Sequence, residues 1–322
     1  MLSEFGLISR YFNRALPPDP RLILGIGDDC ALLAPAAGMQ LAVSSDMLVE
    51  GRHFFPQADP ARLGHKSLAV NLSDLAAMGA KPLGFTLALS LPRADEAWLQ
   101  AFSDGMFRLA EEHGCFLVGG DTTRGPLNIC ITVFGEVPDG QALRRDAARA
   151  DDDIWVSGGL GDARLALAGL RQEILIDSAT IEACQGRLHE PAPRVALGCA
   201  LRGIAHAAID ISDGLVGDLG HILERSGKGA VLDADAVPAG PALEAQPPEL
   251  RRRFALAGGD DYELCFTAPR SRRGAVRAAG QAAGVPVARI GHVTSSPGLR
   301  LVDGAGAPLD PAPDAFDHFR SP

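Results

Sequence analysis

Five segments of the chain share one design, in which a short apolar run leads into glycine or serine and one or two aspartates follow. The aspartates of these segments are Asp28 and Asp29, Asp46, Asp121, Asp210 and Asp213, and Asp260 and Asp261. Short apolar runs that alternate with longer helical patterns are typical of α/β folds. Such folds present ligand-binding side chains where strands meet loops. One segment of this kind is usually a turn, but five of them predict a shared carboxylate site.

The apolar runs predict the strands. Apolar and β-branched residues dominate them. The predicted strands are Arg21–Gly25, Met39–Ser44, Leu83–Leu91, Phe116–Val118, Leu127–Val137, Asp153–Ser157, Ala207–Ile211, Ala230–Leu232 and Glu263–Thr267.

Three segments predict helices. Leu63–Met78 and Ala94–His113 carry apolar residues at helical spacing, and Gly114 follows the second as a C-terminal glycine. Leu215–Arg225 follows a Ser-Asp pair that is suited to N-capping. The segment Val237–Leu250 carries four prolines and is predicted to be a long surface loop.

The length of 322 residues predicts two domains rather than one. Between Pro138 and Asp153 the sequence turns polar, which places the boundary there. We therefore expect an N-terminal domain over residues 1–140 and a C-terminal domain over residues 150–322.

The composition argues against several classes of protein. The formal net charge of −10 argues against a nucleic-acid surface, which requires a basic stripe. No apolar run approaches the ~18 residues of a membrane span, and Glu4 stands where a signal peptide needs positive charge. The six cysteines form no CxxC pair, which argues against a zinc site or a disulfide framework. We expect a cytoplasmic protein that binds neither nucleic acid nor membrane.

The aspartate segments suit metal and phosphate chemistry. Carboxylates and hydroxyls are hard oxygen ligands of the kind that Mg²⁺ prefers, and adjacent glycines let phosphate approach main-chain N–H groups. Asn71 and Asp74 add two oxygen donors on one helix face. P-loop, protein-kinase and dinucleotide motifs are absent. The segment Gly158–Asp162 either receives a phosphate at a helix N-terminus or is a plain strand-to-helix turn.

Several of these segments, in this order, resemble thiamine-monophosphate kinases, a family related to aminoimidazole-ribotide synthetase, selenophosphate synthetase and the hydrogenase maturation protein HypE. The strings NLSDLAAMGA and DISDGL are the most specific. The matching stretches are Gly25–Leu32, Ser45–Phe54, Lys66–Ala80, Gly119–Thr123, Ile209–Ile222 and Gly258–Phe266.

The resemblance implies a two-domain PurM-like α/β (α+β) fold and a homodimer. The N-terminal α/β domain would bind ATP and Mg²⁺ and form the dimer contact, beside a C-terminal α/β domain. The implied reaction is in-line transfer of the γ-phosphoryl group of ATP to thiamine monophosphate, the last step of thiamine diphosphate biosynthesis. The acceptor phosphate has a second pKa near ~6, so we expect no general base, and positioning by several Mg²⁺ ions carries catalysis.

The resemblance also implies roles for individual residues. The metal ligands would be Asp29, Ser44, Ser45, Asp46, Asp74, Asp121, Asp210 and Asp213. The nucleotide contacts would be Gly120, Asp121, Arg145 and Ser212. The contacts to thiamine monophosphate would be His53, Asp260 and Phe316. The family commonly has glutamate where this chain has Asp260, so the carboxylate here is one methylene shorter.

Other interpretations stay open at this point. His53 and Phe316 also fit purely structural roles, and Arg145 also fits a surface ion pair with Asp146 or Asp151. A HypE-like enzyme would need a reactive cysteine at the extreme C-terminus, whereas the last cysteine here is Cys265. A non-catalytic Mg²⁺ or nucleotide sensor on the same scaffold is the alternative from another class, and it would need fewer metal ligands.

Overall fold

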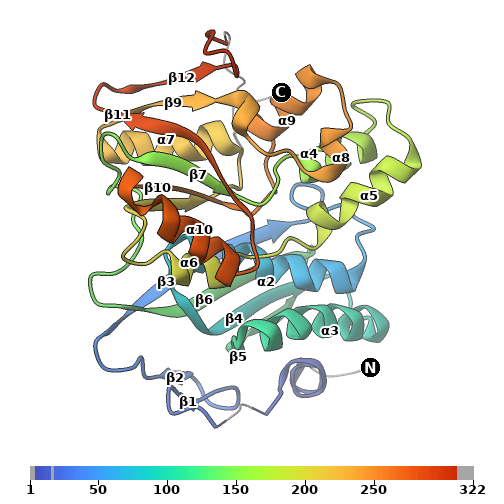
Figure 1. Cartoon of the computed structure of the whole chain (residues 1–322). Coiled ribbons are helices and arrows are strands. Elements are labelled where there is room, and N and C mark those ends of the chain that lie inside the picture. The colour runs from blue at the N-terminus through green and yellow to red at the C-terminus, as the bar shows by residue number, and fades with distance from the viewer. Residues whose placement is uncertain (1–3, 16–17, 310–322) are drawn as a thin grey trace. The chain divides into compact units, whose positions relative to one another are not determined.

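The computed structural model describes residues 4–15 and 18–309, so Phe316 lies outside the described residues. The chain divides into two compact units (Figure 1). Unit 1 comprises Met1–Leu75 and Ala80–Gly140, and unit 2 comprises Ala76–Gly79 and Gln141–Pro322.

Unit 1 is built on a four-stranded sheet in the order β3-β6-β4-β5. The strands are β3 (Met39–Val49), β6 (Asn128–Pro138), β4 (Lys81–Leu91) and β5 (Phe116–Arg124). Strand β6 pairs antiparallel with β3 and with β4, and β4 pairs parallel with β5. Strands β3 and β5 are therefore the two edges of the sheet.

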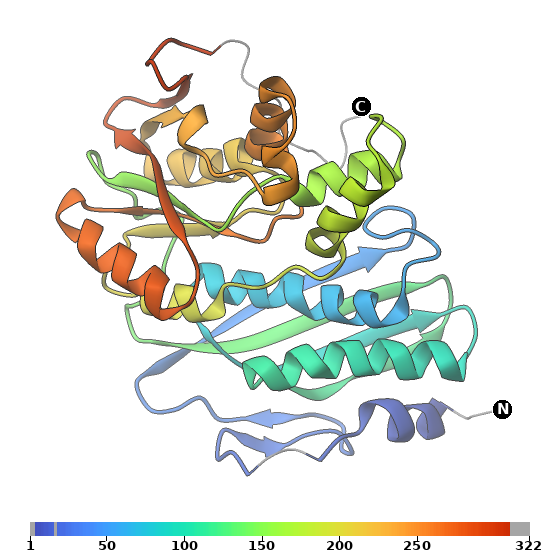
Figure 2. The same ribbon diagram turned by 45° about the vertical axis from the view of Figure 1, so that its right-hand side comes forward.

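Helices α2 (Pro60–Ala77) and α3 (Glu96–His113) cover one face of this sheet, side by side (Figure 2). They approach closely because both carry glycine at their contact. A Cβ at Gly64 would lie 2.0 Å from the Phe102 carbonyl oxygen, and one at Gly105 would lie 1.9 Å from that of Ala61. Helix α3 ends at Gly114 in the left-handed conformation, as predicted.

The opposite face of the sheet is apolar and exposed along β3. Leu41, Val43 and Met47 alternate on this face and are 45%, 55% and 54% exposed. A strand whose side chains alternate between two faces normally hides its apolar side chains. Unit 1 alone therefore leaves apolar surface unburied.

The remaining elements of unit 1 lie before β3. They are α1 (Glu4–Leu7), the π-helix η1 (Ile8–Phe12), β1 (Leu22–Leu24) and β2 (Leu32–Leu33). Arg21 anchors this segment, because its guanidinium donates to Asp19 at 2.5 Å and to Glu136 of β6 at 2.6 Å. The Glu136 carboxylate also accepts the Ala36 N–H, at 3.2 Å.

Unit 2 is built on a six-stranded sheet in the order β12-β9-β11-β7-β10-β8. The strands are β7 (Asp153–Ser157), β8 (Ala207–Asp210), β9 (Gly229–Asp233), β10 (Leu264–Ala268), β11 (Val287–Thr294) and β12 (Gly298–Val302). Only the pair β12–β9 is parallel. Trp155 and Phe266 stack at 6.5 Å between ring centroids in its core.

Helices lie on both sides of the unit 2 sheet (Figure 1). They are α4 (Asp162–Leu170), α5 (Ser178–His189), α6 (Val195–Ala200), α7 (Leu215–Ser226), α8 (Pro241–Glu244), α9 (Pro248–Ala257) and α10 (Arg273–Ala282), with the 3₁₀ turns η2 (Ala234–Ala236) and η3 (Arg270–Arg272). No helix in residues 4–15 or 18–309 is long and apolar enough to cross a membrane.

Each predicted strand corresponds to a strand of the structure. The predicted ends of two strands are wrong, and so is one predicted loop. Strands β3 and β5 run further than predicted, so Asp46 and Asp121 lie inside strands instead of beyond their ends. The segment predicted as a loop, Val237–Leu250, contains α8 and the start of α9, because proline fits the first turn of a helix.

Candidate functional site

A polar cluster lies where β3 passes α2. The Ser44 hydroxyl donates to the Asp74 carboxylate at 2.5 Å. The Asp46 N–H donates to the Asn71 side-chain oxygen at 3.2 Å, and the Asn71 amide nitrogen donates to the Ser67 carbonyl at 3.0 Å. Asn71 is buried, and its two hydrogen bonds connect β3 to α2. The spacing of Asn71 and Asp74 on one helix face is what allows both to face β3.

The cluster brings two carboxylates, those of Asp46 and Asp74, close together. Burial of Asp46 and the nearby Asp74 carboxylate raise the pKa of Asp46 to about 6. Carboxylates held this close in a partly buried place favour a bound cation. In the part of the chain that the structure describes, no group of three or more His, Cys, Asp and Glu side chains is arranged to hold a metal ion. An open set of two carboxylates and a hydroxyl suits Mg²⁺, which usually keeps waters and takes substrate phosphates.

Ser45 and Asp121 lie on the other face of the sheet. Ser45 pairs with Thr132, and its hydroxyl donates to the Ile131 carbonyl at 3.2 Å. Asp121, on the far edge strand, pairs with the exposed Ala88. Because side chains alternate between faces, neither residue joins the cluster of Asp46 and Asp74 within one chain.

Gly120, next to Asp121, has a backbone that only glycine adopts readily. Its φ is +144°, and a Cβ there would lie 1.9 Å from the Leu87 carbonyl oxygen. Glycine is therefore required at this position because the main chain of β4 approaches β5 closely there.

Asp29 and His53 lie in loops of unit 1. Asp29 is exposed between β1 and β2, and its N–H donates to the Asp28 carboxylate at 2.9 Å. His53 follows β3, and its Nδ1 accepts the Val49 N–H at 3.0 Å. This bond assigns the proton of a neutral His53 to Nε2.

In unit 2, Asp218 organises the loop between β8 and α7. The loop begins after Asp210, which is the last residue of β8 and is buried. One carboxylate oxygen of Asp218 accepts the N–H groups of Ser212, Asp213 and Gly214, each at 3.1 Å. Burial and the Asp213 carboxylate raise the pKa of Asp218 to about 7.

The predicted capping of α7 by the Ser-Asp pair is wrong. The N-cap residue is Gly214, and no side chain caps it from that position. Asp218, inside the first turn of the helix, takes the N–H groups of the preceding loop instead.

The loop that carries Asp260 is joined to the loop of Ser212 by main-chain bonds. The Asp260 N–H donates to the Ser212 carbonyl at 2.9 Å, and the Tyr262 N–H donates to the Ile211 carbonyl at 2.8 Å. Asp260 and Tyr262 have φ of 65° and 51°, which non-glycine residues rarely adopt. These main-chain bonds hold the two loops side by side.

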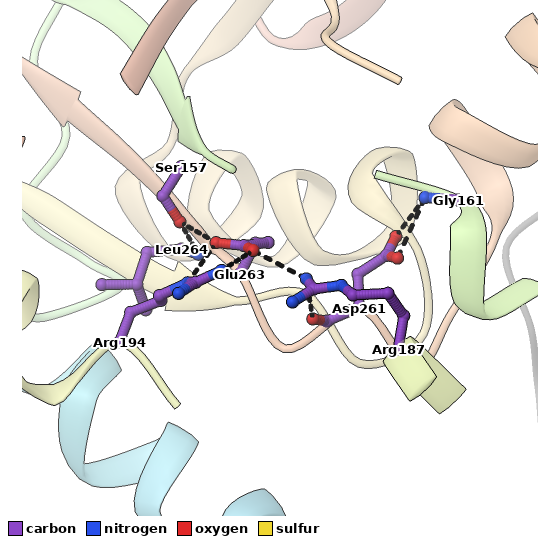
Figure 3. A network of polar contacts seen from close by, with 7 residues as sticks. All are labelled: Ser157, Gly161, Arg187, Arg194, Asp261, Glu263 and Leu264. Atoms are coloured by element: carbon purple, nitrogen blue, oxygen red, sulfur yellow. Dashed lines mark hydrogen bonds and ion pairs between the residues drawn. The ribbon is translucent and has the colours of Figure 1, made fainter. Parts of the chain in front are cut away.

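Sequence reasoning missed a buried ionic network beneath this loop (Figure 3). Glu263 is fully buried and accepts the Ser157 hydroxyl at 2.5 Å, Arg187 at 2.7 Å and Arg194 at 2.7 Å. The Asp261 carboxylate, also fully buried, accepts the Gly161 N–H at 2.9 Å. Burial raises the pKa of Asp261 well above its usual range.

The network also settles the two readings of the Gly158–Asp162 segment. The Gly161 N–H is bonded to Asp261, and a Cβ at Gly158 would lie 2.1 Å from a Glu263 carboxylate oxygen. The segment is a strand-to-helix turn shaped around buried carboxylates, and its glycines serve that packing.

Arg145 is exposed in the segment of unit 2 that precedes β7. Asp146 pairs with Arg144 at 2.5 Å, and Asp151 lies 3.6 Å from Arg270, so the surface ion pair considered for Arg145 is not formed. Among the described residues, the Arg145 guanidinium has no hydrogen-bond or ion-pair partner. An unpaired guanidinium is suited to binding phosphate.

Comparison with known proteins places these features in a family. Residues 27–137 match the N-terminal domain of AIR synthase related proteins, and residues 149–304 match the C-terminal domain. The thiamine-monophosphate kinase of Escherichia coli (strain K12) is 48% identical over 99% of this chain and 99% of its own.

Solved structures agree. The thiamine-monophosphate kinase of Stenotrophomonas maltophilia K279a superposes with a TM-score of 0.84 at 49% identity, covering 91% of this chain and 93% of that chain. A structure described as AaThiL complexed with AMPPCP and TMP gives a TM-score of 0.77 at 30% identity, with 89% of each chain covered. The predicted fold class is confirmed, and this chain belongs to the thiamine-monophosphate kinase family.

Proposed function

We propose that this chain transfers the γ-phosphoryl group of ATP to thiamine monophosphate and releases ADP and thiamine diphosphate. The observation that carries the proposal is the match to thiamine-monophosphate kinases over 99% of the chain. The related structure with AMPPCP and TMP supports an ATP-type nucleotide and thiamine monophosphate as the two ligands.

The donor set fits Mg²⁺. Ser44, Asp46 and Asp74 supply hard oxygens around a partly buried negative charge. The proposed ligands are Asp29, Ser44, Ser45, Asp46, Asp74, Asp121, Asp210 and Asp213. When bound, Mg²⁺ supplies charge that screens the repulsion between the two phosphate groups.

The residues of the chain supply binding and positioning. Gly120, Asp121, Arg145 and Ser212 are the proposed nucleotide contacts, and His53, Asp260 and Phe316 are the proposed contacts to thiamine monophosphate. The Nε2–H of His53 is a donor suited to a phosphate oxygen, and the carboxylate of Asp260 suits the cationic thiazolium. The acceptor phosphate is largely a dianion at neutral pH, so the chain needs to orient it and not to deprotonate it.

We propose that the active form is a homodimer with two-fold symmetry. The exposed row of Leu41, Val43 and Met47 supports a contact between two copies of the unit 1 sheet. Asp121 pairs with Ala88 in the row that also contains Met47, so it would lie at that contact. We propose the cytoplasm as the compartment, which the six free cysteines support.

Product analysis tests the proposal. Purified protein, ATP, MgCl₂ and thiamine monophosphate should yield ADP and thiamine diphosphate in equal amounts by chromatography. Asp74→Asn serves as the matched inactive control, since it removes one carboxylate of the cluster and keeps the side-chain shape. Release of ADP without thiamine diphosphate would overturn the proposal.

A further inference from the structure

The turn that carries Asp260 has an unfavourable backbone that needs support from its surroundings. Asp260 and Tyr262 are both left-handed, at φ 65° and 51°, with Asp261 between them. Non-glycine residues keep such conformations only where the surrounding contacts impose them. The carboxylate of Asp261 is bonded to the Gly161 N–H, which holds the middle of the turn in the interior.

Arg187 connects the main chain of this turn to the buried acid that follows it. Its Nη2 donates to the Asp261 carbonyl at 3.3 Å and to the Glu263 carboxylate at 2.7 Å. One nitrogen therefore connects the main chain of Asp261 to the side chain of Glu263. Figure 3 shows the guanidinium between these two acceptors. Arg187 comes from α5, outside both loops.

Arg194 contacts the same acid in a different way. Its Nε donates to the Glu263 carboxylate at 2.7 Å, and its Nη2 donates to the other oxygen of that carboxylate. Both of these bonds end on the Glu263 side chain, whereas Arg187 also bonds the main chain of the turn. The two arginines share the neutralisation of Glu263, and Arg187 alone adds a link to the turn.

The neighbouring loop has its own support. Three N–H groups of residues 212–214 are bonded to the Asp218 carboxylate, which does not depend on Arg187. Loss of Arg187 should therefore loosen the turn of Asp260 while the loop of Ser212 keeps its shape.

We propose that Arg187 is a positioning residue, which holds the left-handed turn so that the Asp260 carboxylate is aimed at the cationic ring of thiamine monophosphate. The inference rests on the proposed role of Asp260 in the kinase reaction. In this proposal Arg187 positions the turn that contacts thiamine monophosphate, and Asp218 positions the loop of Ser212 that contacts the nucleotide.

Two matched variants test the inference. Arg187→Met and Arg194→Met each leave Glu263 with one arginine, and only the first removes the donor to the Asp261 carbonyl. Arg187→Met should raise the KM for thiamine monophosphate about tenfold, the effect of losing a charge-assisted hydrogen bond. The KM for ATP should stay within about twofold of wild type, and Arg194→Met should change the KM for thiamine monophosphate by less than about threefold. Equal increases of this KM in both variants would overturn the inference.

Hydrogen exchange gives a readout that does not depend on the substrate. In the ligand-free protein, Arg187→Met should speed exchange in peptides covering 258–263, where the Asp260 and Tyr262 amides are bonded, and leave 212–214 protected. Arg194→Met should leave both regions close to wild type. Unchanged exchange at 258–263 in Arg187→Met would refute the positioning role even if thiamine monophosphate proves not to be the acceptor. Arg187→Lys, which keeps the charge beside Glu263, replaces the Met variant if that variant does not fold.

Discussion

Replacing Asp46 by asparagine should separate stability from activity. Asp46 lies beside Asp74, whose carboxylate accepts the Ser44 hydroxyl, and the Asp46 main chain is held by Asn71. Asparagine keeps the shape of the side chain and leaves the main-chain bond to Asn71 in place. The substitution therefore removes one charge from a partly buried pair of carboxylates and changes little else.

The size of the effect follows from the pKa of Asp46, which burial and Asp74 raise from 3.8 to about 6. The folded chain binds this proton more tightly than the unfolded chain, so the free energy of unfolding rises as the pH falls through 6 toward 3.8. At pH 7.5 that gain is absent, and a shift of about two units corresponds to at most roughly 3 kcal/mol. Metal-free Asp46→Asn should consequently melt at the wild-type temperature or up to about 6 °C higher.

Thermal melts at pH 7.5 and pH 5 check this prediction, with Asp139→Asn as a control for the loss of one exposed charge in the same unit. The advantage of Asp46→Asn over wild type should shrink at pH 5, where wild-type Asp46 is largely protonated. Its turnover should fall at least ~10²-fold, because a lost metal ligand costs several kcal/mol in the transition state. Mg²⁺ with a non-hydrolysable ATP analogue should raise the melting temperature of wild type much more than that of the variant. A large drop in melting temperature together with near-normal turnover would show that Asp46 is only structural.

Three further outcomes are expected. Free thiamine should be at least ~10³-fold poorer than its monophosphate in kcat/KM, because its hydroxyl needs a general base; equal turnover would contradict the dianion mechanism. Light scattering should give twice the chain mass of 33.6 kDa, and Val43→Lys should shift the protein to single chains. Asp218→Ala should lower the free energy of unfolding by at least about 3 kcal/mol, since three N–H groups lose their acceptor, and should raise the KM for ATP; denaturant titration and steady-state kinetics measure the two effects.

The helix side of the cluster around Asp46 could be predicted from the sequence, whereas the predicted strand ended at Ser44, before Asp46. Helical spacing puts Asn71 and Asp74 on one face of α2, and alternation along β3 puts Ser44 and Asp46 on one face of the sheet. The structure had to supply the extension of β3 to Asp46 and the pairing of the two elements, which is seen in the bonds from Ser44 to Asp74 and from Asp46 to Asn71.

The placement of Asp121 could not be predicted. It depends on the length of β5 and on a register shift near Phe85 and Thr86, which decides which face each later residue occupies. A sequence pattern shows that an aspartate follows two glycines, but it does not show the register of the strand. The ion pair between Arg187 and Glu263 could not be predicted for a different reason. The two residues are 76 positions apart along the chain, so no local sequence pattern connects them.

The two units hold their acidic residues by different means, and this difference has a consequence for the reaction. In unit 1, a strand and a helix fix the carboxylates of Asp46 and Asp74, so their mutual repulsion is imposed by regular structure. In unit 2, the loops of Asp213 and Asp260 take their shape from buried carboxylates, Asp218 and Glu263, that bond loop N–H groups or arginines. Buried acids of this kind keep the loops in shape before any ligand arrives, and preorganised groups lose little energy to rearrangement during phosphoryl transfer. A site that brings two phosphate-bearing ligands together needs carboxylates in fixed positions that bind cations. The proposed phosphoryl transfer depends on such positioning and needs no general base.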